Sequence, residues 1–123
     1  MDKIASPRKK KENTFLLPAA SSKKYFTRAS TIFRDGDSSS IELERAIKEL
    51  MKATSYMPNQ FKHYILYGNI YKKGMDLSSA IYMYRYAYRL DEDNLTIKKL
   101  LASALSQQGQ EVLYMACKSL EKQ

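Results

Sequence analysis

Residues 67–94 read YGNIYKKGMDLSSAIYMYRYAYRLDEDN and contain six tyrosines. Within them, YMYRYAY has tyrosine at every second position, which by itself favours a β-strand with one aromatic face. The surrounding window of about 14 residues between turn signals is long for a strand and ordinary for a helix. On a helix, one complete apolar face forms from Ala80, Met83, Tyr84, Ala87 and Tyr88. We therefore predict a helix, with Tyr82 and Tyr86 on its other faces.

The segments on either side show the same helical spacing. A first helix is expected from residue 25, with Phe26, Ala29, Ile32 and Phe33 on one face, and it ends at the DGD turn of residues 35–37. A second begins at Ser39, which forms a capping box with Glu42, and it ends near Pro58. Four further helices are expected at about 60–73, 77–90, 95–107 and 110–121. The sequence thus predicts an all-α fold of six helices in antiparallel pairs.

Small and large apolar residues recur along this pattern every 34 residues. The pairs are Ala46 and Ala80, Leu50 and Tyr84, and Ala53 and Ala87. A 34-residue recurrence of paired helices is typical of tetratricopeptide repeats. Residues 61–94 resemble that family at seven positions: Tyr64, Tyr67, Gly68, Tyr71, Ala80, Tyr84 and Ala87. The small residues would let neighbouring helices approach closely, while the aromatic residues would fill the gaps between them.

The resemblance implies a short α-solenoid of about three helix pairs at 27–60, 61–94 and 95–123. The first segment matches only in its second helix, and the last matches only in its first helix. In the second helix of the last segment, Tyr114 replaces an expected alanine. The final helix keeps an apolar stripe that no following helix covers, which indicates a short form or part of a longer repeat array. We expect residues 25–123 to form the repeat domain.

Residues 1–24 are expected to form a disordered basic tail. Residues 1–34 hold nine Lys/Arg and two Asp/Glu, whereas the rest of the chain is nearly neutral. The tail contains the cluster Arg8, Lys9, Lys10 and Lys11 beside Ser6-Pro7. Such a cluster is typical of nuclear import or of contact with nucleic acid or another acidic surface. A nucleic-acid-associated or nuclear protein that acts through this tail is therefore the alternative hypothesis, although a solvated tail without a partner is also consistent with the pattern.

The family resemblance also implies a partner-binding groove lined by the first helix of each pair. Carried onto residues 61–94, the groove positions are Lys62, Ile65, Asn69, Lys72 and Lys73. Three cations with an amide and an aliphatic side chain suit a peptide with acidic groups. Ile65 and Leu100 stand where a chaperone-tail clamp needs lysine and asparagine, so we do not expect that clamp. The main hypothesis is a noncatalytic scaffold that binds a protein partner, either a peptide or a subunit of a larger assembly.

Catalytic residue patterns are sparse. His63 and Cys117 are the only histidine and cysteine, and they are too few for a metal cluster. We expect His63 on a helix surface, Cys117 as an apolar filler, no cofactor, no small-molecule substrate and no enzymatic activity. With a single cysteine and no apolar run long enough for a membrane span, the expected location is the cytoplasm, with the nucleus or a cytoskeletal or ciliary structure as alternatives.

Overall fold

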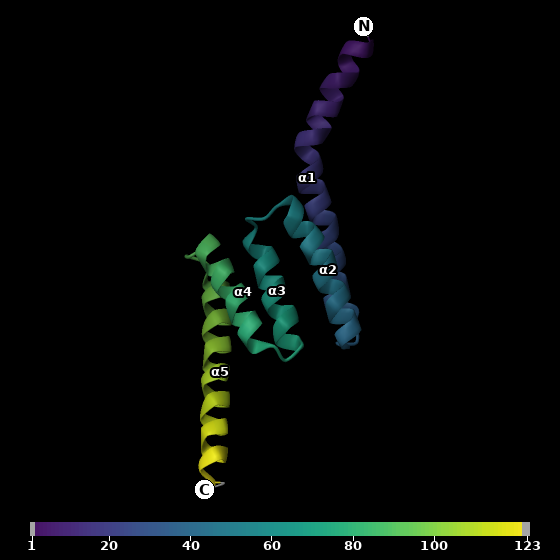
Figure 1. Cartoon of the computed structure of the whole chain (residues 1–123). Coiled ribbons are helices and arrows are strands. Elements are labelled where there is room, and N and C mark those ends of the chain that lie inside the picture. Colours follow the sequence, from purple (N-terminus) through teal and green to yellow (C-terminus); the bar gives the residue numbers. More distant parts are fainter. Residues whose placement is uncertain (1, 122–123) are drawn as a thin grey trace.

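The computed structural model describes the backbone of residues 2–121 and the side chains of residues 17–121. It contains five helices and no strand in that part of the chain. They are α1 (Asp2–Asp35), α2 (Ser40–Tyr56), α3 (Phe61–Lys73), α4 (Leu77–Leu90) and α5 (Leu95–Glu121). The helices lie side by side in chain order, and each runs antiparallel to the one before it (Figure 1). The predicted all-α fold is confirmed.

The tyrosine-rich segment forms helix α4. Ala80, Tyr84 and Ala87 are fully buried, while Met83 and Tyr88 are half-buried on the same side. Tyr82 is 68% exposed, as expected for the opposite face. The buried positions of α4 thus recur with the period of a helix, and the alternating tyrosines are divided between the buried side, with Tyr84 and Tyr88, and the exposed side, with Tyr82.

The six residues of the 34-residue recurrence occupy equivalent environments. Each has no exposed surface: Ala46, Leu50 and Ala53 on α2, and Ala80, Tyr84 and Ala87 on α4. Each set lies along the buried face of the second helix of an antiparallel pair, α1–α2 and α3–α4. The recurrence in sequence thus corresponds to a recurrence in burial.

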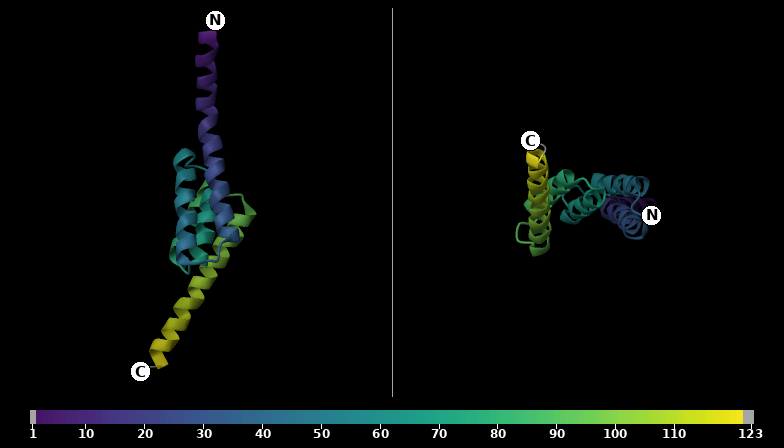
Figure 2. Two further views of the ribbon diagram at one scale, coloured as in Figure 1. Left: turned by 90° about the vertical axis from the view of Figure 1, so that its right-hand side faces the viewer. Right: turned by 90° about the horizontal axis from the view of Figure 1, so that it is seen from below.

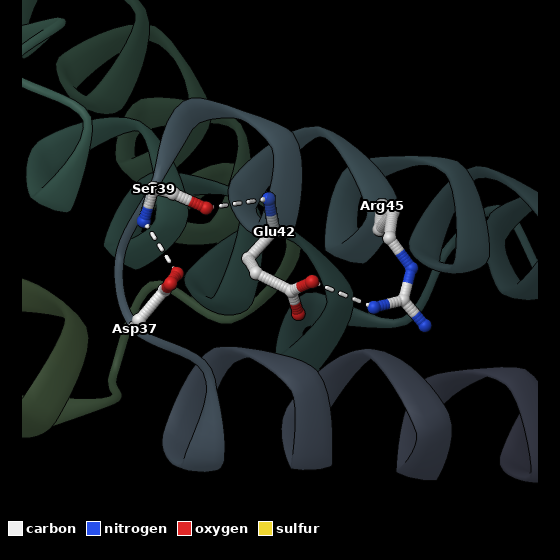
Figure 3. Close-up of polar contacts among 4 residues, drawn as sticks. All are labelled: Asp37, Ser39, Glu42 and Arg45. Atoms are coloured by element: carbon white, nitrogen blue, oxygen red, sulfur yellow. Dashed lines mark hydrogen bonds and ion pairs between the residues drawn. The ribbon is translucent and has the colours of Figure 1, made fainter.

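The start of α2 is held by side-chain hydrogen bonds (Figure 3). The Ser39 hydroxyl accepts the backbone N–H of Glu42 at 3.3 Å, which is the expected half of the capping box. The other half is replaced, because the Ser39 N–H donates to Asp37 Oδ1 at 3.0 Å. The freed Glu42 carboxylate instead pairs with Arg45 at 2.7 Å. These bonds satisfy two backbone donors where the chain reverses direction.

The amino-terminal segment differs from the predicted disordered tail. Helix α1 begins at Asp2, so residues 2–24 belong to the helix that was expected to begin at residue 25. Ser22 is only 4% exposed and packs against α2 and α3, so the prediction that this helix begins at residue 25 is wrong. Ser22, Phe26 and Ala29 lie on one helical face, and this spacing extends into the segment that composition assigned to the tail. Helix α1 is bent along its length (Figures 1 and 2), and its sequence includes Pro18, a residue type that has no N–H for the helix and bends it.

The carboxy-terminal part also differs from prediction. The two helices expected at 95–107 and 110–121 form one continuous helix, α5, so the third segment is not a helix pair. Gly109 lies within α5 and its backbone remains helical. A single glycine in a helix costs only about 1 kcal/mol relative to alanine. The strong helix formers around it, including Gln, Glu, Leu and Met, outweigh that cost.

The turn between α3 and α4 stores strain at Met75. The Met75 N–H donates to the Lys72 carbonyl and the Asp76 N–H to the Tyr71 carbonyl, which together form a Schellman motif. Met75 therefore has a φ of 66°, whereas the neighbouring Gly74 has an ordinary φ of −81°. The glycine that marks this turn in the sequence is thus one position away from the residue that needs glycine's freedom.

Replacing Met75 with glycine is expected to raise the free energy of unfolding by about 0.5–1 kcal/mol, because a left-handed conformation costs about 1–2 kcal/mol in residues that carry a Cβ. Met75 is 86% exposed, so little packing is lost. Urea denaturation followed by circular dichroism checks this. A lower stability for Met75→Gly would show that the turn is not strained.

No helix in the described part of the chain combines the length and the apolar character that crossing a bilayer requires.

Candidate interaction groove between α1 and α3

Helices α1 and α3 border a groove made of two adjoining pockets that are open to solvent. The larger has a volume of about 440 Å³ and is walled by residues 19–27 of α1, by His63 of α3 and by the loop before α3. The smaller, of about 210 Å³, includes Ile65, Leu66 and Asn69 of α3. Phe26 and Lys62 line both pockets and join them. We call this surface the α1–α3 groove.

The base of the larger pocket is a contact between three side chains. The Ser22 hydroxyl donates to the Ala53 carbonyl at 3.0 Å and lies 3.4 Å from Nε2 of His63. The Phe26 ring stacks on the His63 ring, with centroids 5.3 Å apart. These contacts connect α1, α2 and α3 at one point, so the groove wall is part of the packed structure.

His63 is therefore a core residue, and its predicted place on the helix surface is wrong. It is 4% exposed, and its Nδ1 is buried without a hydrogen-bond partner among the described atoms. The periodicity of α3 did not reveal this, since α3 is covered on two sides, by α1 and α2 and by α4. A helix buried on two sides has no single apolar stripe.

Three of the five predicted groove residues come together. Lys62, Ile65 and Asn69 line the smaller pocket. Lys73 has a different environment, because its Nζ lies 3.4 Å from the Phe33 carbonyl and 4.8 Å from the centre of the Phe33 ring. It thus interacts with the last turn of α1, where a cation is favoured by the helix dipole. Lys72 does not line either pocket.

Asn69 has a structural partner as well as a groove position. Its Oδ1 accepts a hydrogen bond from the Tyr84 hydroxyl at 2.5 Å. This bond fixes the amide, so that its NH₂ group is the part of the side chain that remains to act as a donor. The family pattern predicted the position of Asn69, whereas the bond that orients it depends on how α4 packs on α3.

The groove has a clear charge character. Lys23 from α1 and Lys62 from α3 line it, both with exposed side chains, and none of its lining residues is acidic. The same groove also exposes apolar surface, supplied mainly by Phe26, Ile65 and Leu66. Lys23 and Phe26 were not predicted as groove residues, because the family resemblance was carried over only onto the helix at 61–73. The cationic segment KKYF at residues 23–26 was the available signal.

The burial of His63 predicts a pH-dependent stability. Desolvation lowers the pKa of His63 and outweighs an opposing effect from the backbone of Met57. Since the folded-state pKa is below the unfolded value of about 6.5, the unfolded chain binds more protons as the pH falls through 6.5. His63 is therefore expected to leave the free energy of unfolding unchanged above about pH 7 and to lower it as the solution is acidified through the range below 6.5.

Urea denaturation at pH 7.5 and pH 5.5 measures this loss. The His63→Gln variant, which cannot titrate, is the control and is expected to lose less stability between the two pH values. An equal loss in both proteins would assign the acid sensitivity to other groups.

Cys117 and His63 do not form a nucleophile–base pair of the kind that cysteine enzymes use. Cys117 is exposed on α5, whereas His63 contacts Ser22 and Phe26 of α1. The prediction that Cys117 is an apolar filler is also wrong, because the part of α5 that carries it extends past the neighbouring helices (Figure 1). No group of three potential metal ligands occurs among the described residues.

The predicted basic cluster Arg8, Lys9, Lys10 and Lys11 lies outside the residues whose side chains are described.

Tyr82 and Tyr86, which were predicted to lie away from the apolar face of α4, have different environments. The Tyr86 ring lies 4.2 Å from the Tyr64 ring and thus packs across α3 and α4, whereas Tyr82 is largely exposed. They do not form a joint aromatic surface.

Comparison with known proteins adds no assignment to this geometry: no family model matches the sequence, and no curated protein matches it.

Proposed function

We propose that this protein is a noncatalytic interaction module whose paired helices resemble tetratricopeptide repeats, and that it binds a partner segment in the α1–α3 groove. The observation that carries the proposal is a groove of two adjoining pockets with two exposed cations, apolar surface beside them and no acidic lining residue. These features suit a peptide that places an aromatic or aliphatic side chain over Phe26 and carboxylates near Lys23 and Lys62.

The dimensions of the groove support a peptide rather than a small metabolite. Its two pockets are open to solvent and joined in a row, and each has the surface of two helices as its wall. Small-molecule sites in proteins usually bury most of the ligand. An open groove instead leaves one side of its occupant in water, as the docking of a peptide on a helical surface does.

The test uses the full chain and a fluorescent peptide array in which aromatic and glutamate residues are varied. We expect Lys62→Glu to weaken the binding of acidic, aromatic peptides by about tenfold or more, because a charge-assisted hydrogen bond contributes about 1.5–3 kcal/mol. Lys99→Glu is the matched control, since it makes the same charge change on an exposed position of α5 that lines no part of the groove.

Fluorescence anisotropy measures both affinities. A tenfold loss in Lys62→Glu with little change in Lys99→Glu supports the groove. Equal losses in both variants would indicate nonspecific attraction of acidic peptides to a basic protein, and no loss in Lys62→Glu would rule out this groove as the binding site.

A further inference from the structure

Helix α5 has two apolar faces, of which only one is covered. The inner face holds Ile97, Leu100, Leu101 and Ala104, which are buried or half-buried where α5 packs on the preceding helices. Helix α4 has 14 residues and α5 has 27, so α5 is longer by about 20 Å at 1.5 Å per residue. It extends past the other helices as a free arm (Figures 1 and 2).

The second face runs along the arm on another side of the helix. We call it the outer stripe; it consists of Ala102, Leu105, Gly109, Val112, Leu113, Ala116 and Leu120. These residues recur at helical spacing and lie on one side, turned by roughly a third of a revolution from the inner face. All seven are exposed, and Leu113 and Leu120 each expose 68% of their surface. A contiguous exposed apolar surface of this kind marks an interaction site.

The distribution of charge allows an identical partner. No residue of the outer stripe is charged, and its flanking residues Ser106, Gln110 and Ser119 are also neutral. The charged residues of the arm, Glu111, Lys118 and Glu121, project from other sides of the helix. The strongly basic segment, with a net charge of +7 over residues 1–34, belongs to α1, whose start lies at the opposite end of the molecule from the arm (Figure 1). Two outer stripes can therefore meet without bringing like charges together.

The order of small and large residues along the stripe is self-complementary. If two α5 helices run antiparallel with Leu105 opposite Leu120, then Gly109 lies opposite Ala116 and Val112 opposite Leu113. Small residues face each other in this register and allow close approach, while the aliphatic side chains pack on either side. A twofold axis between the helices also closes the assembly at two copies.

We propose that the outer stripe of α5 is a homotypic interface that joins two copies of this chain as an antiparallel helix pair. The stripe is a single helix face about 28 Å long and about 10 Å wide, so its area of roughly 300 Å² is smaller than the roughly 800 Å² per partner of a stable interface. The dimer is accordingly weak and reversible.

Sedimentation equilibrium of the full chain at physiological ionic strength tests the proposal. The wild-type protein is expected to shift from monomer to dimer as its concentration rises. Leu113→Lys is expected to remain monomeric because it introduces a charge into the stripe of both copies. Tyr114→Lys is the matched control: Tyr114 is adjacent and 61% exposed, but it points to nearly the opposite side of the helix, so this variant is expected to dimerise as the wild type does.

Circular dichroism of both variants establishes that α5 stays helical. A wild-type protein that stays monomeric up to sub-millimolar concentration would overturn the proposal, because the stripe would then not join two copies of this chain. Dimerisation that survives Leu113→Lys, or that is lost equally in Tyr114→Lys, would also overturn it by placing the interface elsewhere.

Discussion

Replacing Tyr84 with alanine is expected to lower the free energy of unfolding by about 3–5 kcal/mol, the range for removing a large aromatic side chain from a core. Tyr84 has no exposed surface and is the largest fully buried side chain described. It packs with Leu77, Ala80 and Ala104, which come from α4 and α5, while its ring contacts α3 at Gly68. Its removal therefore leaves a cavity where three helices meet.

The hydroxyl of Tyr84 adds to this loss. It donates to Asn69 Oδ1 at 2.5 Å, and burial raises the pKa of Tyr84 to about 12, so the donor is present throughout the physiological pH range. The Tyr84→Phe variant keeps the ring and removes only this bond, which is expected to cost about 1 kcal/mol.

Tyr82→Ala provides the matched control, because Tyr82 is on the same helix and is 68% exposed. Its change in stability is expected to stay within about 0.5 kcal/mol, as for most surface substitutions. Urea denaturation of the three variants measures the differences. Similar losses for Tyr84→Ala and Tyr82→Ala would contradict the described packing of α4.

Replacing Gly68 with alanine is expected to lower the free energy of unfolding by about 1–2 kcal/mol, the difference between the cost of overpacking and the gain in helix propensity. A Cβ at residue 68 would lie 2.3 Å from Cε1 of Tyr84 and 2.5 Å from its Cδ1. The Tyr84 ring is fully buried and hydrogen-bonded, so it cannot move aside without separating α3 from α4. Overpacking of this kind costs about 1–3 kcal/mol, and alanine's helix propensity recovers at most about 1 kcal/mol of it.

Gly109→Ala is the same substitution in an open position and should have the opposite sign. A Cβ at Gly109 would meet nothing within 4 Å, so the gain in helix propensity of about 1 kcal/mol is expected to appear as higher stability or higher helicity of α5. Thermal and urea denaturation followed by circular dichroism compare the two variants. A neutral or stabilising Gly68→Ala would show that α3 and α4 are not in close contact at this point.

The double variant Gly68→Ala/Tyr84→Leu tests the contact itself. If the clash with the ring is the cause, the cost of Gly68→Ala is expected to be smaller in the Tyr84→Leu background, because the smaller side chain makes room for the new methyl group. Additive effects of the two substitutions would assign the loss to another source.

Helix type and the buried face of α4 were predictable from the sequence because they depend on local periodicity. The spacing of Ala80, Tyr84 and Ala87 determines which side of α4 is buried, whatever its neighbours are. The 34-residue recurrence predicted that Ala46, Leu50 and Ala53 would be equivalent to these residues, and all six are fully buried. Likewise, the Ser39 cap depends only on residues within one turn.

The candidate groove was only partly predictable. Lys62, Ile65 and Asn69 share a pocket as expected, but Lys73 contacts Phe33, and the opposite wall of the groove comes from α1. That wall includes Lys23, in a segment whose composition suggested disorder. Composition describes the average tendency of a segment, whereas the burial of Ser22 depends on contacts with Ala53 and His63, which are 31 and 41 residues away.

The amino-acid sequence by itself determined the helical class of this protein, its 34-residue stride and the small residues at which helices meet, because each depends on residue spacing within one or two helices. Only the tertiary structure decided where α1 begins to pack, that α5 continues through Gly109, and that His63 is buried while Cys117 is exposed. The physical reason is that burial in a row of stacked helices depends on which neighbours cover each face, and α3 is covered on two sides whereas the end of α5 is covered on none of its sides in the described structure.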